Sequence, residues 1–134
     1  MLDYEMFNPY EGLIFDMDGT LIDTMPVHAQ AWTMVGERFG YEFDCQIMYN
    51  FGGATVRTIA GEMMKAANMP LDRIEDVLAA KRELSYQLIP TQSKLLPTFE
   101  IVKSFHQKKP IALGSGSHRK IIDMLMDKLA IAPY

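Results

Sequence analysis

Two aspartates one residue apart, Asp16 and Asp18, follow a short apolar run and precede a Gly-Thr pair. Alternate side chains of a strand lie on the same face, so the two carboxylates can converge where the strand ends and a loop begins. Two like charges held this close repel each other unless a cation lies between them. The spacing therefore predicts metal-assisted attack on a phosphate, while the alternative is a simple Asp-Gly turn.

A second motif, at residues 111–117, could bind the phosphate. Three apolar residues precede the sequence Gly-Ser-Gly-Ser, and an amphipathic helical pattern follows it. A glycine-flanked turn at a helix N-terminus presents free N–H groups and the positive end of the helix dipole, which can hold a phosphate dianion. The alternative is a plain helix cap, for which Ser117 is the expected capping residue.

Hydrophobic periodicity predicts helices over most of the chain between these motifs. Apolar residues repeat at helical spacing over residues 26–39, 56–67 and 71–88. Gly40 is expected to end the first of these helices and Pro90 the third. Residues 91–97 are polar and bounded by proline, which favours a linker, and a further helix is expected near residues 99–107.

The predicted strands, residues 12–16 and 111–113, are short and apolar on consecutive positions. This pattern is typical of strands buried on both faces of a parallel α/β sheet. The helical stretch between them is longer than a simple crossover. We therefore predict an α/β protein with an incomplete core of parallel strands, residues 1–23 plus 96–134, and an inserted helical cap domain, residues 24–95.

Composition limits the function classes. The net charge of −4 provides no basic surface for nucleic acid. No stretch approaches the roughly 18 apolar residues of a membrane span. The single cysteine, Cys45, cannot form an internal disulfide, which favours a reducing compartment. We expect a cytoplasmic protein that binds neither nucleic acid nor a membrane.

The run Phe15 to Thr24, FDMDGTLIDT, resembles the first motif of the haloacid dehalogenase-like superfamily of phosphotransferases, an apolar strand ending in D-x-D-G-T-[LI]-x-D-[ST]. Every position of that pattern is filled, and the likeness covers the whole chain. Members with a helical cap at this place include β-phosphoglucomutase and small sugar-phosphate phosphatases. The resemblance implies a Rossmann-like core.

The resemblance also implies roles for individual residues. Asp16 would be the nucleophile that becomes a transient aspartyl phosphate, and Asp18 the general acid and base. Mg²⁺ would be held by the Asp16 carboxylate and the Asp18 backbone carbonyl. Ser115 matches the phosphate-binding serine, with Gly116 beside it, and Thr20 would offer a hydroxyl or amide to the phosphate.

Two residues of the predicted cap domain are candidates for substrate contact. His28 lies on an apolar stripe, where a histidine is often a packed core residue, but similar sugar phosphomutases carry a histidine before an Ala-Trp pair, as here. Arg57 could bind a second phosphate or a sugar hydroxyl. In the mutases the comparable arginine lies one residue earlier, where this chain has Val56, which weakens the mutase alternative.

Two further motifs of the resembled family are missing from these 134 residues. They are a lysine that neutralises the phosphate and a pair of acids that complete the metal site, normally about thirty or more residues beyond the serine. Four lysines, Lys103, Lys108, Lys109 and Lys120, are interpreted as solvated helix or turn charges. We expect the chain to be part of a longer phosphatase and inactive alone, or to self-associate through the open edge of its sheet.

The leading hypothesis is a Mg²⁺-dependent phosphatase that acts on a small sugar phosphate through an aspartyl phosphate. One alternative is a β-phosphoglucomutase, which would transfer phosphate between sugar positions instead of releasing it. Another is a non-catalytic remnant that binds phosphate without turnover. A phospho-accepting receiver domain ranks lowest, because it has no large helical insertion after its first strand.

Overall fold

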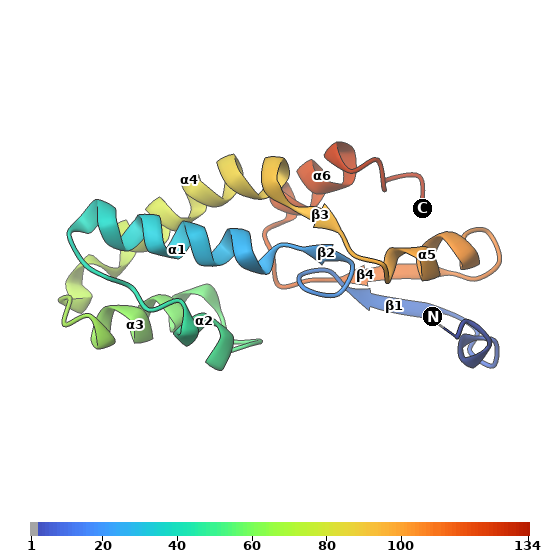
Figure 1. Ribbon diagram of the computed structural model, residues 1–134, viewed down its shortest axis with the longest axis horizontal. Helices are drawn as coiled ribbons and strands as arrows, with labels where there is room; N and C mark the ends of the chain where they lie inside the picture. The colour runs from blue at the N-terminus through green and yellow to red at the C-terminus, as the bar shows by residue number, and fades with distance from the viewer. Residues whose placement is uncertain (1–2) are drawn as a thin grey trace. The chain divides into compact units, whose positions relative to one another are not determined.

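The computed structural model describes residues 3–134, which form two compact units (Figure 1). Unit 1 combines the N-terminal segment up to Thr24 with Ser93–Tyr134, and unit 2 is Met25–Gln92. Within residues 3–134, no helix has the length and apolar character to cross a membrane.

A parallel pair of strands organises unit 1. Strand β1 (Leu13–Asp16) lies beside β4 (Ile111–Gly114), with Leu13 opposite Ile111 and Asp16 opposite Gly114. Because the strands are parallel and in this register, their carboxyl ends lie at the same edge of the sheet. The two sequence motifs that follow β1 and β4 are thereby brought together.

The prediction that both faces of these strands are buried is wrong. Half-buried and exposed residues alternate along β1 and β4, and the Ile14 side chain on the open face is 81% exposed. Phe15 and Leu113, on the other face, line a hollow together with residues of two helices. The sheet is therefore covered on one side, and the outer edge of β1 has no strand partner in residues 3–134. Self-association through that edge stays a prediction.

The covered face of the sheet packs on α5 (Phe99–Phe105) and α6 (Arg119–Lys128). Both helices bury apolar residues: Phe99, Ile101, Val102 and Phe105 from α5, and Ile121 and Leu125 from α6. Side chains of the sheet and of both helices, among them Phe15, Leu113 and Phe99, line a small hollow of about 100 Å³. This apolar layer covers one face of the strands and does not cover their carboxyl ends.

A second, antiparallel pair joins β2 (Ile22–Asp23) to β3 (Lys94–Leu95). The sequence predicted a linker here, because β3 is too short and too polar for periodicity to reveal it. Two further bonds extend the pair: the Leu96 N–H donates to the Leu21 carbonyl, and the Thr98 hydroxyl donates to the Thr20 carbonyl. The loop after β1 is thus anchored to the returning chain.

Lys109 ties the N-terminal segment to unit 1. Its ammonium donates to three backbone carbonyls, those of Phe7, Asn8 and Tyr10, beside the short 3-10 helix η1 (Glu5–Phe7). The same ammonium lies 5.4 Å from the ring centroid of Phe105. An ammonium has three donors, and all three have acceptors here. The interpretation of Lys109 as a solvated charge is therefore wrong, because the carbonyls it serves become its neighbours only in the folded chain.

Unit 2 is helical, as the periodicity predicted. Its elements are α1 (Met25–Phe39), α2 (Gln46–Asn50), α3 (Val56–Ala66), the 3-10 turn η2 (Leu71–Arg73) and α4 (Ile74–Gln92). They enclose one apolar cluster of Ala31, Trp32, Val35, Phe43, Met48, Ala60, Met63, Met64, Met69, Val77, Ala80 and Leu84. Four of these twelve residues are methionines, whose flexible side chains fill irregular gaps between helices.

Helix α1 ends at Gly40, as predicted. Gly40 has φ +80°, a left-handed conformation that glycine adopts without strain. The Gly40 N–H donates to the Glu37 carbonyl and the Tyr41 N–H to the Gly36 carbonyl, which is the Schellman arrangement.

Pro90 does not end α4, in contrast to the prediction. The helix continues to Gln92 and buries Pro90 in its last turns. Proline removes an N–H donor within a helix. The Thr91 hydroxyl donates to the carbonyls of Gln87 and Leu88 in the same turns.

Candidate active site

A tight loop follows β1 and carries the first motif. The N–H groups of Thr20, Leu21 and Ile22 all approach the carbonyl of Met17, at 3.2, 3.0 and 3.1 Å, and Met17 itself is fully buried. Gly19 has φ +74°, which explains why glycine occupies this position. The loop turns the chain sharply after Asp18 and leads it into β2.

The Asp18 carboxylate lies at the centre of a cluster of hydroxyls. Thr24 Oγ1 donates to Oδ1 at 2.6 Å, and Ser117 Oγ donates to Oδ2 at 2.9 Å. Ser115 Oγ lies 3.4 Å from the same Oδ2. Thr24 is fully buried and Asp18 is half-buried, so the carboxylate is held firmly in one orientation. The structure thus brings Asp18 together with the serines of the second motif.

Ser117 has a different role from the predicted one. The residue at the N-cap of α6 is His118, which makes no side-chain capping bond. The Ser117 hydroxyl binds Asp18 instead, and its N–H donates to Ser115 Oγ at 3.1 Å. Because that N–H occupies a lone pair of the Ser115 oxygen, it orients the Ser115 hydroxyl. The capping prediction failed because a charged acceptor from a distant part of the chain competes for the Ser117 hydroxyl.

Asp16 lies at the end of β1 with an exposed side chain. Its Oδ2 accepts from the Thr20 hydroxyl over a long 3.4 Å. The carboxylate is thus accessible to a ligand from solvent, which suits a nucleophile. Thr20 contacts the nucleophile candidate, and its predicted bond to a phosphate stays a prediction.

The chemistry of the donor set fits a hard divalent cation. The Asp16 carboxylate and the main-chain carbonyl of Asp18 are oxygen ligands, and Mg²⁺ binds through one or two carboxylates while keeping several waters. The Asp18 carboxylate fits less well as a ligand, because its two oxygens accept from hydroxyls of Thr24 and Ser117. Within residues 3–134, no cluster of three or more His, Cys, Asp or Glu side chains is suited to a metal.

Gly116 occupies the exposed turn between β4 and α6. A Cβ added there would meet no heavy atom within 4 Å, and its φ is not in the left-handed region. Neither packing nor backbone conformation within this chain therefore requires a glycine. The space beside Gly116 is therefore open to a ligand.

The two predicted cap residues belong to unit 2. His28 Nδ1 lies 3.1 Å from the ammonium of Lys81. Arg57 is exposed and forms an ion pair with Glu75 at 2.5 Å. Their predicted contacts with substrate stay predictions.

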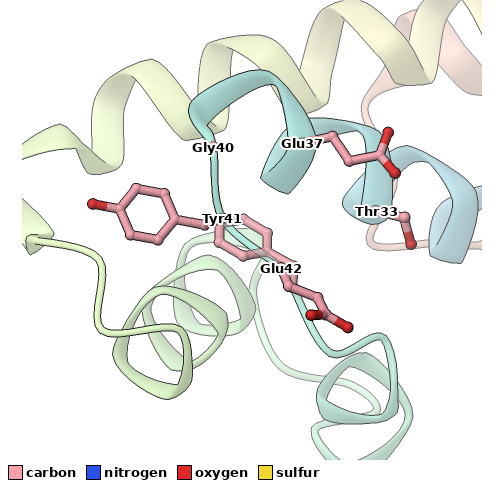
Figure 2. A pocket seen from close by; sticks show the side chains of 6 residues that line it. Thr33, Glu37, Gly40, Tyr41 and Glu42 are labelled. Carbon is pink, nitrogen blue, oxygen red and sulfur yellow. The ribbon is translucent and has the colours of Figure 1, made fainter.

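A larger hollow, of about 500 Å³, lies in unit 2 at the end of α1. Figure 2 shows the Glu37 and Glu42 carboxylates on one side of it and the Tyr41 ring directed away from them. Two carboxylates repel a phosphate dianion, so this hollow is not a candidate for the phosphate site.

Two site residues, Thr24 and Ser117, were not among the predicted site residues. Thr24 is the last position of the FDMDGTLIDT motif, so its presence in the pattern was a signal of a role beside the aspartates. Ser117 follows Ser115 by two residues, the spacing at which a turn can direct both hydroxyls to one acceptor. Only the contact with Asp18, 99 residues away in sequence, distinguishes this role from capping.

Comparison with known protein families gives an extensive match. The family model described as haloacid dehalogenase-like hydrolase matches residues 10–134. A Haemophilus influenzae protein is 97% identical over all 134 residues, and this chain spans 67% of its length. The fructose-1-phosphate phosphatase of Escherichia coli is 34% identical over 129 residues, which make up 96% of this chain and 68% of that enzyme.

Comparison with solved structures supports the fold. A Thermotoga maritima structure provisionally described as a beta-phosphoglucomutase has a TM-score of 0.65 at 24% identity, covering 92% of this chain and 57% of that chain. The predicted α/β fold class with a Rossmann-like core is confirmed.

Proposed function

The chain belongs to the haloacid dehalogenase-like hydrolases, and on this premise we propose that it carries the phosphate-transfer site of a Mg²⁺-dependent phosphatase for small sugar phosphates. The observation that carries the proposal is the meeting of the Asp16-Asp18 loop with Ser115 and Ser117 at the carboxyl ends of β1 and β4. In parallel α/β sheets this edge is where ligands bind.

In the proposed reaction Asp16 attacks phosphorus, the bond to the sugar oxygen breaks, and an aspartyl phosphate forms. Asp18 gives a proton to the departing sugar oxygen and later takes one from the water that hydrolyses the aspartyl phosphate. A bound Mg²⁺ would supply charge neutralisation on the phosphate oxygens. Asp16 is exposed enough for attack, and Asp18 is fixed by the hydroxyls of Thr24 and Ser117.

Hydroxyl groups suit the two roles proposed for Asp18. A serine or threonine hydroxyl can donate a hydrogen bond to a carboxylate and can accept one from a carboxylic acid. Thr24 and Ser117 can therefore hold Asp18 in place in both protonation states. A lysine or arginine at these positions would favour the ionised form alone.

The phosphate is proposed to bind in the turn Ser115-Gly116-Ser117 ahead of α6. The Ser115 hydroxyl is oriented by the Ser117 N–H, and the backbone around Gly116 is open. N–H groups at the start of α6 add the positive end of a helix dipole. These features support Ser115 and Gly116 as phosphate-binding residues.

A sugar phosphate is proposed as the substrate because a relative 34% identical to this chain is a fructose-1-phosphate phosphatase. The test measures inorganic phosphate released from fructose 1-phosphate by the full-length Haemophilus influenzae relative and by this chain, with Mg²⁺ or with EDTA. We expect release by the relative that depends on Mg²⁺. Transfer of phosphate between sugar positions without net release would support the mutase alternative, and binding without turnover would overturn the enzymatic proposal.

Thr24→Val is expected to lower kcat about tenfold while KM changes less than twofold, because one hydrogen bond that positions Asp18 is lost, worth about 1.4 kcal/mol. Valine has nearly the shape of threonine, so the fully buried position stays filled. The measurement is steady-state phosphate release in the full-length relative. Thr24→Ser, which keeps the hydroxyl, should restore most of the rate. Equal rates for Thr24→Val and the unchanged protein would contradict the role of this contact.

A further inference from the structure

A hydroxyl of the returning chain holds the loop that carries the aspartates. Thr98 follows Thr20 by 78 residues in the sequence, and its Oγ1 donates to the Thr20 carbonyl. The next carbonyl of the loop, that of Leu21, accepts from the Leu96 N–H at 2.8 Å. All four residues belong to unit 1. Two successive carbonyls of the loop are thus held from outside it, one by a side chain and one by the main chain.

The Thr98 hydroxyl is available for this bond because α5 does not use it as a cap. Thr98 is the N-cap residue of α5, where a threonine hydroxyl commonly accepts from an N–H of the first turn. It has helical backbone angles, φ −57° and ψ −22°, and makes no side-chain capping bond. The first three N–H groups of the helix donate instead to main-chain carbonyls three residues earlier, each at 3.0 Å. The first turn of α5 is therefore satisfied without this hydroxyl.

Thr20 connects this anchor to the nucleophile of the proposed reaction. Its carbonyl accepts from Thr98, and its own hydroxyl contacts Asp16 Oδ2 over 3.4 Å. The direction of the Thr20 hydroxyl depends on the main chain that carries it, so fixing the carbonyl limits where the hydroxyl can lie. The Asp16 side chain is exposed, and an exposed carboxylate is oriented mainly by its hydrogen bonds. A change at Thr98 is therefore transmitted to Asp16 through Thr20.

We propose that Thr98 is a positioning residue for the nucleophile: its hydroxyl holds the Thr20 main chain so that the Thr20 hydroxyl orients the Asp16 carboxylate for attack on phosphorus. This inference rests on the proposed function, in which Asp16 is the nucleophile. A shift of about 1 Å in a reacting group can slow a reaction about 100-fold. Because Thr98 acts on the attacking group, its loss lowers kcat and has little effect on KM.

The first experiment is independent of activity and uses the full-length Haemophilus influenzae relative. Amide hydrogen exchange is measured by NMR for Thr20, Leu21 and Ile22, whose N–H groups approach the Met17 carbonyl. In Thr98→Val, which nearly keeps the shape and lacks the donor, we expect these amides to exchange at least about fivefold faster, because the loop opens more often. Amides of α6 should change less than about twofold. Thr98→Ser, which keeps the hydroxyl, should retain the original rates.

Unchanged exchange of the loop amides in Thr98→Val overturns the proposal. If the methyl group that replaces the hydroxyl prevents folding, Thr98→Ala decides the same question, because alanine removes the donor and places no atom against the Thr20 carbonyl.

The second experiment tests the route through Thr20 by steady-state phosphate release from fructose 1-phosphate. We expect Thr98→Val to lower kcat about fivefold with KM within about twofold, and Thr98→Ser to restore most of the rate. Thr20→Val lacks the hydroxyl that contacts Asp16 and should lower kcat at least as much. Adding Thr98→Val to Thr20→Val should then cost less than about twofold more, because both changes act through one contact. Losses that multiply in the double variant, or a raised KM in Thr98→Val, overturn the proposal.

Thr33→Val is the matched control. It makes the same chemical change at an exposed residue of α1, whose hydroxyl contacts the Ala29 carbonyl and the Cys45 thiol within unit 2. Its kcat and its loop exchange should stay within about twofold. Faster loop exchange in Thr98→Val with an unchanged kcat overturns the link to the nucleophile. Absence of phosphate release by the unchanged enzyme refutes the proposed function instead, and the exchange measurement then decides by itself whether Thr98 holds the loop.

Discussion

Asp16→Asn is expected to abolish phosphate release, with kcat lowered at least about 1,000-fold, equivalent to about 4 kcal/mol in the activation barrier. The amide oxygen is uncharged and a poor nucleophile, so no aspartyl phosphate can form. Asparagine keeps the shape of the side chain and its single bond from Thr20, so the fold should be unaffected. The measurement is steady-state phosphate release from fructose 1-phosphate by the full-length Haemophilus influenzae relative.

Two controls separate the loss of the nucleophile from other effects. Asp127→Asn makes the same chemical change at an exposed site of α6 and should leave kcat within about twofold. Raising the Mg²⁺ concentration should not restore Asp16→Asn, whereas a variant impaired only in metal binding would recover. Incubation with ³²P-labelled substrate should label the unchanged enzyme and not the variant. More than about one tenth of the original rate in Asp16→Asn would refute the assignment of the nucleophile.

Gly36→Ala is expected to destabilise unit 2 by about 2 kcal/mol, although alanine is the better helix former by about 1 kcal/mol. A Cβ at position 36 would lie 2.8 Å from the Tyr41 carbonyl oxygen, and 3.0 and 3.1 Å from Cγ and N of Phe43. Two of these three atoms, Tyr41 O and Phe43 N, belong to the backbone, so they can move only if the whole 41–43 segment shifts. The steric cost therefore exceeds the gain in helix propensity.

Gly61→Ala is the matched control. Gly61 also lies inside a helix, α3, but its added Cβ would meet only the flexible end of the Ile74 side chain, at 4.0 Å. We expect this variant to be more stable than the unchanged chain by about 0.5 to 1 kcal/mol. Both are measured by urea unfolding followed through the fluorescence of Trp32, the single tryptophan, which is 2% exposed in the core of unit 2. Equal stabilisation by the two alanines would show that the approach of the 41–43 segment to α1 is wrong.

The separate elements were largely predictable because their signals are local. The apolar stripe and Gly40 define α1 through side-chain spacing and one backbone conformation, both properties of adjacent residues. Predictions failed where a local sequence pattern was overridden by the packing or pairing of the folded chain. Pro90 resembles a helix end, yet α4 continues to Gln92 and buries Pro90 among its last turns. The β3 strand was missed because its two residues pair with β2 across about seventy intervening residues.

For the site, the sequence alone determined which residue types stand after each strand: two carboxylates after β1, and a serine-glycine turn after β4. Tertiary structure decided which groups meet. Parallel pairing in one register places Asp16 opposite Gly114, and Ser117 then binds Asp18 instead of capping α6. It also decided that one face of the sheet stays open and that Lys109 and Lys81 are held by groups distant in sequence. The physical reason is that a hydroxyl or an ammonium binds the best acceptor within about 3 Å, and only the folded chain determines which acceptors are that close.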